Sequence, residues 1–522
     1  MGQSVVFEAV SPFMLLERWS HLPTRSFASY EDPDGRLLTV SYAAQVDRSL
    51  RAAAVLRQLG VHRGNRVHVH LNNCPEFLDL WLGANAIGAV LVPTNPLSTV
   101  DELAHFLSDS GATASITEDS LYDQVKEAIA PGIRVLTRSE LKTKAAEASP
   151  THHTPALGTD LAAILYTSGT TSRPKGVMVT NENYVGVGYA CATHYSVGVD
   201  DRWLIVLPFF HGNAQYYCTM SALAVGASIA VMPSFSATKF GAQARRHSAT
   251  LASLFAAPIR MILAQPEGRH DKHSRIRTTM FAQPITEDQA LEFERRFTTR
   301  LIHGYGMTET VLPPTLNPVS TQRRYDSMGK AIPGAKLRIV DENGKDAPKG
   351  QAGELLVGGR MGQTIANGYW RNPDATAETF PNGWLHTGDV VRRDGDGYYY
   401  FVDRTKDMIK RAGENVAAGE IERVVNEHLS VFECAAIGIP DEVRDEQIVV
   451  YVVVGEDQTF DEESLLRWCR ERLSKFKVPT AFVRVDLLPR TAVGKIRKVE
   501  LREKALKHSV NLKHSVTSVE MD

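Results

Sequence analysis

A short segment rich in hydroxyl groups and glycine, Tyr166-Thr-Ser-Gly-Thr-Thr-Ser-Arg-Pro-Lys175, is the part of this sequence best suited to phosphate chemistry. Gly169 lets the backbone approach an oxyanion, and successive amide groups can point into one concavity. Hydroxyl donors and one compact positive charge are added by Thr167, Ser168, Thr170, Thr171 and Lys175. The segment is not a Walker A loop, because Gly176 follows the lysine where that motif needs Ser or Thr. Its composition alone fits either a phosphate-binding loop or a surface turn.

Further motifs follow in a fixed order: Gly304-Tyr-Gly-Met-Thr-Glu309, Trp384-Leu-His-Thr-Gly-Asp389, Asp403-Arg-Thr-Lys-Asp-Met-Ile-Lys410 and Pro489-Arg-Thr-Ala-Val-Gly-Lys495. With the first segment, they make the chain resemble the adenylate-forming superfamily of acyl-CoA synthetases, amino-acid-activating adenylation domains and luciferases. The resemblance runs from about Phe13 to Lys498. It implies an enzyme that uses ATP to activate a carboxylate as an acyl-adenylate, with Mg²⁺ as its metal and coenzyme A as the acceptor.

The resemblance also implies roles for individual residues. The β- and γ-phosphates of ATP fall to Thr167, Ser168, Gly169, Thr170, Thr171 and Lys175. The rest of the nucleotide falls to Gly304, Tyr305, Gly306, Thr308, Asp389 and Arg404. Within this set Tyr305 would stack on adenine, Thr308 would contact the α-phosphate, and Asp389 would accept hydrogen bonds from the ribose hydroxyls. Glu309 would bind Mg²⁺, a hard cation that prefers oxygen ligands.

The C-terminal residues imply a site that is assembled from two domains. Lys495 resembles the family lysine that bridges the carboxylate and the α-phosphate during adenylation, and Lys406 resembles the hinge residue. Rotation about this hinge would exchange Lys495 for a second face that begins at Lys410. On that face coenzyme A would meet Lys410, Arg411, Gly413 and Glu414. His211, which follows Pro208-Phe-Phe, resembles a family histidine at the acyl pocket; a hydrogen-bonded core histidine is the alternative.

The composition of the chain sets limits on its fold and partners. A length of 522 residues exceeds what one core usually organises, so at least two domains are expected. A net charge of −2 argues against nucleic acid as a general partner. We find no apolar run near 20 residues and no signal peptide, so no integral membrane association is expected. Five scattered cysteines without a CxxC motif favour a reducing, cytoplasmic location. The sequence is compatible with a homo-oligomer.

Apolar runs alternate with amphipathic stretches, which predicts an α/β fold with largely buried strands. We place a large multi-subdomain N-terminal domain at 1–402, a hinge at 403–406, a small mobile α+β domain at 407–505, and a disordered tail at 506–522. Residues 41–59 predict a helix whose buried face carries Ala43, Val46, Leu50, Ala53 and Ala54. Residues 138–157 read as a mobile connection, and residues 334–357 as a β-hairpin around Asn343-Gly344.

The sequence leaves the acid substrate open. Three stretches, at 70–77, 411–416 and 438–446, look especially like bacterial crotonobetaine/carnitine–CoA ligases, but none is expected to line the acyl pocket. A quaternary ammonium substrate would need an aromatic cage, for which the candidates are Phe209, Phe210, Tyr216 and Tyr217. Phe281-Ala-Gln-Pro284 replaces the glycine-rich segment common in the family, which predicts bulkier side chains beside the site. Two alternatives remain: an adenylating enzyme whose activated group is captured by an acceptor other than coenzyme A, such as an amine, and a non-catalytic nucleotide-binding relative.

Overall fold

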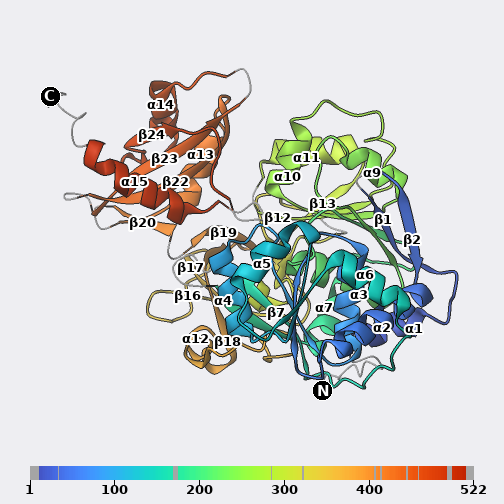
Figure 1. The fold of residues 1–522 in the computed structure, drawn as a ribbon. Coiled ribbons are helices and arrows are strands. Elements are labelled where there is room, and N and C mark those ends of the chain that lie inside the picture. The colour runs from blue at the N-terminus through green and yellow to red at the C-terminus, as the bar shows by residue number, and fades with distance from the viewer. Residues whose placement is uncertain are drawn as a thin grey trace, which may run out of the picture.

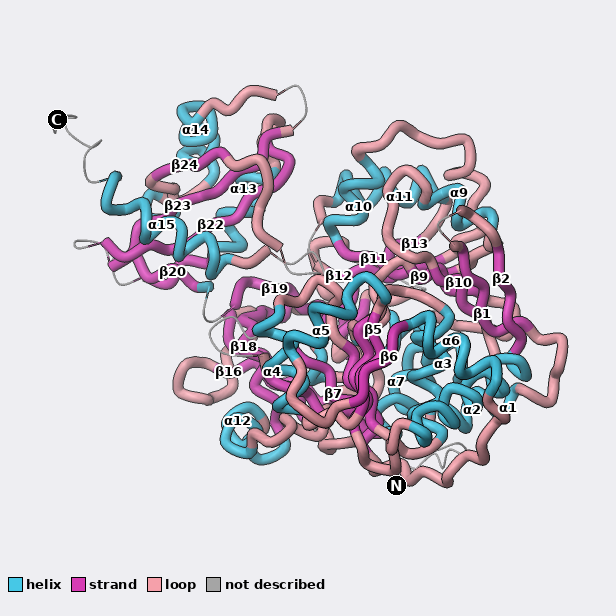
Figure 2. The backbone as a smooth tube through the Cα atoms, in the orientation of Figure 1, coloured by secondary structure: helices cyan, strands magenta, loops and turns pink. Residues whose placement is uncertain are grey.

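The computed structural model describes residues 11–32, 34–167, 174–283, 285–319, 322–404, 407–411, 414–441, 445–455, 458–490 and 496–512. A large N-terminal domain ends at Arg404, and a smaller C-terminal domain begins at Asp407. Figure 1 shows the smaller domain, coloured orange to red, as a separate body beside α10 and β19 of the larger one. Figure 2 shows the same division between the two bodies.

The N-terminal domain contains two sheets with a layer of helices between them. The first sheet has, in spatial order, β6 (Arg134–Thr137), β5 (Ala114–Thr117), β3 (Arg66–His70), β4 (Val90–Pro93), β7 (Leu161–Thr167) and β8 (Lys175–Thr180). Its strands are parallel up to β7, and β8 pairs antiparallel with β7. The helices around this sheet are α1 (Pro12–Trp19), α2 (Tyr42–Gln58), α3 (Pro75–Ala86), α4 (Val100–Ser110), α5 (Tyr122–Ala128), α6 (Arg138–Glu147) and α7 (Asn181–His194).

The second sheet is long and mixed. Its spatial order is β16 (Lys336–Val340), β17 (Ala352–Gly358), β18 (Trp384–Arg393), β19 (Tyr398–Arg404), β15 (Gly329–Ala331), β14 (Thr315–Leu316), β13 (Arg300–Tyr305), β12 (Thr278–Ala282), β11 (Leu251–Phe255), β9 (Arg202–Ile205), β10 (Ser228–Val231), β1 (Ser26–Glu31) and β2 (Leu37–Ser41). It is parallel from β13 through β1, and antiparallel from β16 to β13. Its helices are a π-helix η2 (Asn213–Thr219), α8 (Met220–Val225), α9 (Phe240–Arg246), α10 (Ala256–Leu263), α11 (Glu287–Phe297) and α12 (Pro373–Thr379), with the 3₁₀ turn η3 (Thr308–Thr310).

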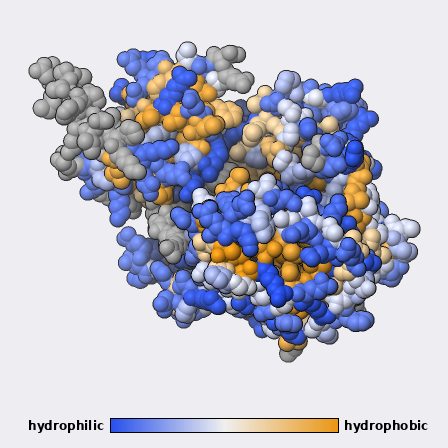
Figure 3. All heavy atoms as spheres, in the orientation of Figure 1, coloured by the Kyte–Doolittle hydropathy of each residue, from blue (hydrophilic) through white to orange (hydrophobic). Residues whose placement is uncertain are grey.

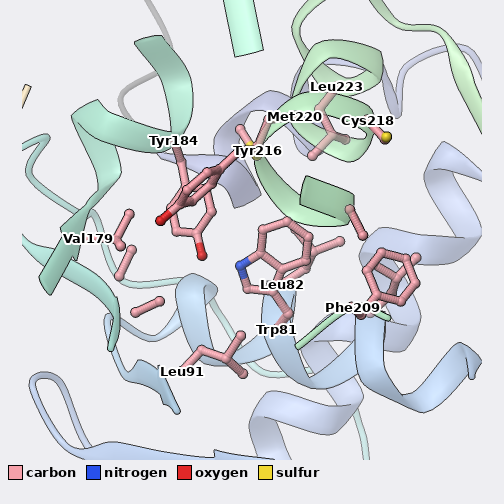
Figure 4. Close-up of a cluster of buried hydrophobic side chains, with 14 of the residues drawn as sticks. Trp81, Leu82, Leu91, Val179, Tyr184, Phe209, Tyr216, Cys218, Met220 and Leu223 are labelled. Atoms are coloured by element: carbon pink, nitrogen blue, oxygen red, sulfur yellow. The ribbon is translucent and has the colours of Figure 1, made fainter. Parts of the chain in front are cut away.

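A continuous hydrophobic core joins the two sheets through the helical layer. Figure 4 shows its centre, where Trp81 of α3 lies beside Tyr184 of α7 and Tyr216 of η2. The ring centroids of Trp81 and Tyr184 are 5.5 Å apart, as are those of Tyr184 and Tyr216. Such fully buried aromatic side chains supply much of the apolar area that stabilises a domain of this size.

The C-terminal domain has its own sheet and core. Strands β20 (Met408–Arg411), β21 (Glu414–Ala417), β22 (Val431–Asp441), β23 (Asp445–Val454) and β24 (Ala481–Arg484) form the sheet, and α13 (Ala418–Asn426), α14 (Glu462–Arg472) and α15 (Lys498–Leu512) pack with it. These elements confirm the α+β prediction for this domain. Helix α15 extends through Leu512, and the disordered tail from residue 506 stays a prediction.

Several local predictions also meet the structure. The hairpin at 334–357 is confirmed by the antiparallel pair β16–β17. The mobile connection at 138–157 is wrong in its first half, because α6 begins at Arg138 behind a capping box of Thr137 and Glu140. The helix at 41–59 is confirmed as α2, but its most buried face carries Gln45 and Ser49. The face is rotated because Gln45 donates a hydrogen bond to the buried Asp79 of α3 at 2.8 Å.

Candidate active site

The ends of β13 and β19 and the middle of β18 bring three of the predicted nucleotide residues together. Tyr305, the last residue of β13, donates a hydrogen bond from Oη to Asp389 Oδ2 at 2.5 Å. The Nε atom of Arg404 lies 3.1 Å from Asp389 Oδ1. Asp389 is only 3% exposed, and its Oδ1 accepts no hydrogen bond from the residues that the structure describes. A buried carboxylate oxygen of this kind is suited to accept a hydroxyl group of a ligand.

Charge and burial act together around Asp389. Burial and the adjacent carboxylate raise the pKa of Tyr305, so this side chain remains a hydrogen-bond donor at neutral pH. Burial disfavours the charged form of Arg404, but Asp389, Tyr305, Asp407 and Glu309 together outweigh it and raise the pKa of the guanidinium. Asp389 is therefore held between a neutral donor and a permanent cation.

The backbone of β18 is shaped to present this carboxylate. Gly388 has a φ of +67°, which side-chain-bearing residues rarely adopt, and the pairing with β17 shifts register between Glu354 and Leu356. Glu354 accepts hydrogen bonds from Gly388 N at 3.0 Å, and its other oxygen contacts His386 Nδ1 at 3.0 Å. The glycine thus serves a bulge within a strand.

A second group of residues links the predicted phosphate lysine to the predicted metal ligand. Glu309 lies in η3, is 5% exposed, and accepts a hydrogen bond at 2.9 Å from Tyr369 Oη. The Nζ atom of Lys175 lies 5.0 Å from the centre of the Tyr369 ring. Tyr369 therefore bridges a cation and a carboxylate that are more than a hundred residues apart in the sequence. Sequence reasoning missed Tyr369, since Asn367-Gly-Tyr-Trp370 contains no charged or nucleophilic group.

The glycines of the 304–309 motif are needed where the chain is crowded. A Cβ atom on Gly306 would lie 2.7 Å from Tyr217 Oη, and one on Gly304 would clash with Leu316. Thr308 begins η3 beside Glu309 and is half-buried. Tyr217, in the π-helix η2, therefore lies directly against the predicted nucleotide segment.

His211 precedes this π-helix, and its ring centre lies 4.3 Å from that of Phe210. Both side chains are half-buried. Phe209, in contrast, is 1% exposed and stacks on Phe77 in the core, and Tyr216 is 1% exposed. The four aromatic residues therefore do not form one accessible cage: Phe209 and Tyr216 serve the core. Because these four rings lie along an irregular segment, the sequence shows no simple period that would tell which of them face the core.

Phe281 corrects the prediction of bulk beside the site. Its side chain is fully buried and stacks on His303, with ring centres 4.6 Å apart. The Phe281 side chain therefore faces the core. Gln283 adopts a φ of +75°, a left-handed conformation that glycine would adopt with less strain.

The remaining predicted residues divide into those that the structure describes and those that lie outside the described ranges. Thr167 pairs with Lys175 across β7 and β8, Lys410 is exposed on β20, and Arg411 donates from Nη1 to the Val478 carbonyl at 2.8 Å. Glu414 begins β21. Ser168, Gly169, Thr170, Thr171, Lys406, Gly413 and Lys495 lie outside the described residues.

Figure 3 shows the surface hollowed between the two domains on the face seen in Figure 1.

Two properties of the described residues bear on cofactors and membranes. They contain no cluster of three or more His, Cys, Asp or Glu side chains that could hold a metal ion. A cation at Glu309 would consequently take most of its ligands from a substrate or water, as Mg²⁺ commonly does with phosphates. None of the described helices has both the length and the apolar character needed to cross a bilayer.

Comparison with known proteins decides the family. Residues 18–370 match the AMP-binding enzyme family, and residues 420–495 match the AMP-binding enzyme C-terminal domain. The chain belongs to the AMP-binding enzyme family. Tyr305 and Glu309 lie in the first matched region, and Asp389 and Arg404 lie between the two.

Relatives of this AMP-binding enzyme match nearly its whole length. The crotonobetaine/carnitine–CoA ligase of Salmonella enteritidis PT4 is 35% identical over 491 residues, which is 91% of this chain and 95% of that protein. ATP-bound MatB from Rhodopseudomonas palustris has a TM-score of 0.85 at 30% identity, covering 94% of this chain and 99% of that one. A benzoate CoA ligase from Burkholderia xenovorans LB400 has a TM-score of 0.85 at 25% identity, with the same coverage of both chains.

Proposed function

We propose that this AMP-binding enzyme is an ATP-dependent carboxylate–CoA ligase. The observation that carries the proposal is the buried Asp389 carboxylate: its Oδ2 accepts from Tyr305, and its Oδ1 lies beside Arg404 but accepts no hydrogen bond from the described residues, so it can accept a ribose hydroxyl. The similarity to two CoA ligases over more than nine-tenths of the chain supports coenzyme A as the acceptor. The substrate class is a small-molecule carboxylic acid.

In the first half-reaction a carboxylate oxygen would attack the α-phosphorus of ATP, and the bond to pyrophosphate would break. Negative charge builds up at the phosphorus, so the site needs cations and oriented donors around it. We assign these roles to Lys495, Thr308 and Lys175, with Tyr305 against the adenine and Asp389 and Arg404 at the ribose. Lys495 would come from the C-terminal domain, which makes domain closure part of this step.

In the second half-reaction the thiol of coenzyme A would attack the acyl carbon, and AMP would leave with the electron pair of the broken acyl–oxygen bond. We assign the face that begins at Lys410 to this step, with Arg411, Gly413 and Glu414 along the pantetheine arm. His211 would lie at the acyl pocket near the reacting carboxylate. Lys406 would be the hinge that exchanges the two faces.

We further propose Mg²⁺ as the metal, with Glu309 as its protein ligand. A single buried carboxylate fits this ion, which accepts substrate phosphates and water as its other ligands. When bound, the ion would neutralise charge on the phosphates. We also propose a cytoplasmic location, because the five cysteines, all described, are buried and unpaired.

The test is a product assay with ATP, coenzyme A and a panel of carboxylic acids, with nucleotides and thioesters resolved by mass spectrometry. We expect AMP, pyrophosphate and one class of acyl-CoA in equal amounts. AMP without a thioester would move the proposal to an enzyme with another acceptor, such as an amine. The absence of ATP turnover with every acid would favour a non-catalytic nucleotide-binding protein.

A further inference from the structure

Helix α4 lies against the end of β7 and the start of β8, the two strands that carry the predicted phosphate-binding residues Thr167 and Lys175. Residues 105 and 109 are one turn apart, so their side chains project from the same face of the helix. His105 Nε2 lies 2.9 Å from the Pro174 carbonyl oxygen, which precedes β8. Tyr166 of β7 donates a hydrogen bond from Oη to Asp109 Oδ2 at 2.5 Å. One helical face thus holds both β7 and β8.

The chemistry of each contact fixes its direction. A carbonyl oxygen can only accept, so His105 must carry a proton on Nε2 to make its contact with Pro174. The Tyr166 ring also packs on Phe106, with ring centres 4.7 Å apart. Burial and the Asp109 carboxylate raise the pKa of Tyr166, which therefore stays protonated as the donor.

The last turn of α4 also holds the segment that carries Tyr369. The carbonyl oxygen of Asp109 accepts hydrogen bonds from Trp370 Nε1 at 3.0 Å and from Arg371 Nη1 at 3.2 Å. Carbonyl groups at a helix C-terminus have no partner within the helix, so they are available for such contacts. The backbone amide of Trp370 donates in turn to the Gly176 carbonyl at 2.8 Å, which ties this segment to β8.

These contacts enclose Lys175 from three sides. A cavity of about 360 Å³ is lined by His105, Asp109, Lys175, Trp370, Arg371 and neighbouring residues. Its lining joins α4, the start of β8 and the segment after Tyr369. Through Tyr369, the same assembly continues to Glu309.

We propose that His105 and Asp109 are positioning residues that anchor the paired ends of β7 and β8 to α4, beside the segment that follows Tyr369, and so set the place of Lys175 relative to Tyr369 and Glu309. The proposal rests on the proposed function, because it assigns Lys175 to the phosphates of ATP. In this proposal neither residue contacts substrate. Both act through the backbone of Pro174 and the side chain of Tyr166.

The test measures binding of MgATP without acid by calorimetry, together with KM for ATP and for the acid and the melting temperature. Asp109→Ala and Tyr166→Phe should each weaken MgATP binding about three- to tenfold, as expected for one hydrogen bond, with KM for the acid unchanged. Because both changes remove the same bond, the double variant should bind little worse than either single variant. Ser108→Ala, an exposed change on the same helix, is the matched control and should bind as the wild type does.

His105 offers a rescue experiment. His105→Ala should weaken MgATP binding, whereas His105→Gln should restore most of it, because the glutamine amide can donate to the Pro174 carbonyl. The proposal is overturned if these variants lower the melting temperature without changing MgATP affinity, if both KM values rise together, or if the double variant is additive. Wild-type protein that binds MgATP but releases no AMP would refute the ligase function and leave the role of α4 measurable; wild-type protein that binds no MgATP would overturn both.

Discussion

At the scale of single residues, the account depends on a carboxylate whose surroundings are built for a ligand. Asp389 has a donor on one oxygen and a guanidinium beside the other, and it is buried in a strand that a glycine bulge distorts. Buried polar atoms that accept no hydrogen bond are costly in a core, so they are retained mainly where a ligand or water completes them. This reasoning supports a ribose contact more strongly than the motif alone does.

Asp389→Asn tests this contact. The amide keeps the shape but loses the charge and one acceptor, and hydrogen bonds to charged groups contribute about 1.5–3 kcal/mol. We expect KM for ATP to rise about 10–100-fold in steady-state assays, with a smaller change in KM for the acid. Asp396→Asn, an exposed change in the turn after the same strand, should leave both values unchanged. A variant Asp389→Asn with normal KM for ATP would remove this residue from the nucleotide site.

Sequence reasoning could propose Asp389 and Glu309 because their motifs resemble those of the adenylate-forming superfamily. It could not find Tyr369, which bridges Lys175 and Glu309, because its partners are set by the fold. The same holds for Glu354, which orients the Gly388 backbone from the neighbouring strand.

At the scale of elements, close packing in the helical layer constrains which residues can face inward. A Cβ atom on Gly83 of α3 would lie 2.5 Å from the Ser49 carbonyl oxygen of α2. The period of apolar residues in α2 pointed to a different face, because Gln45 and Ser49 are polar. The close approach at Gly83 and the hydrogen bond from Gln45 to Asp79 decide the true orientation.

Gly83→Ala should therefore destabilise the protein, because the added methyl group forces α2 and α3 apart. We expect a loss of about 1–3 kcal/mol, measured as a lower midpoint of urea unfolding. Gly186→Ala on α7 is the matched control, since its Cβ would be 3.7 Å from the nearest atom, the Gln363 carbonyl oxygen. That change should be neutral or stabilising by up to about 1 kcal/mol, because alanine favours the helix. Equal midpoints for the two variants would contradict this packing.

His70, the last residue of β3, predicts that the free energy of unfolding depends on pH. Burial lowers the pKa of His70 to about 4, whereas a histidine in an unfolded chain titrates near 6.5. Between these values the unfolded state binds a proton that the folded state does not, so the free energy of unfolding falls as pH falls. For one such histidine the slope is up to about 1.4 kcal/mol per pH unit.

His70→Gln should make this slope shallower by about one proton between pH 4.5 and 6.5, as measured by urea unfolding at several pH values. His62→Gln, at an exposed position before the same strand, is the control and should keep the wild-type slope. An unchanged slope in His70→Gln would show that other groups carry the acid sensitivity.

At the scale of the whole molecule, the proposed chemistry requires the C-terminal domain to close on the N-terminal domain in two different orientations, one for each half-reaction. The described residues that we assign to the nucleotide lie in the N-terminal domain, whereas Lys495, which we propose for adenylation, falls in the part of the sequence matched by the AMP-binding enzyme C-terminal domain. The separate sheets and cores of the two domains could be predicted from the break in pattern near Asp403. Their relative placement could not, because it depends on contacts between surfaces that the sequence does not pair.

Two substitutions separate the half-reactions. Lys495→Ala should abolish adenylation, measured by ATP–pyrophosphate exchange, and leave thioester formation from supplied acyl-AMP largely intact, because this lysine would serve only one closed state. Lys410→Ala should show the opposite bias. Equal loss of both half-reactions in Lys495→Ala would contradict the two-state account, and normal thioester formation in Lys410→Ala would remove that residue from the second face.

The most direct test of the central claim follows the oxygen atoms of the acid. If a carboxylate oxygen attacks the α-phosphorus, turnover of an acid labelled with ¹⁸O in both carboxyl oxygens must transfer one labelled oxygen to AMP. We predict AMP that carries one ¹⁸O for each acyl-CoA formed, and pyrophosphate that carries none, by mass spectrometry. Unlabelled AMP, or label in inorganic phosphate alongside ADP, would contradict an acyl-adenylate and with it the proposed mechanism.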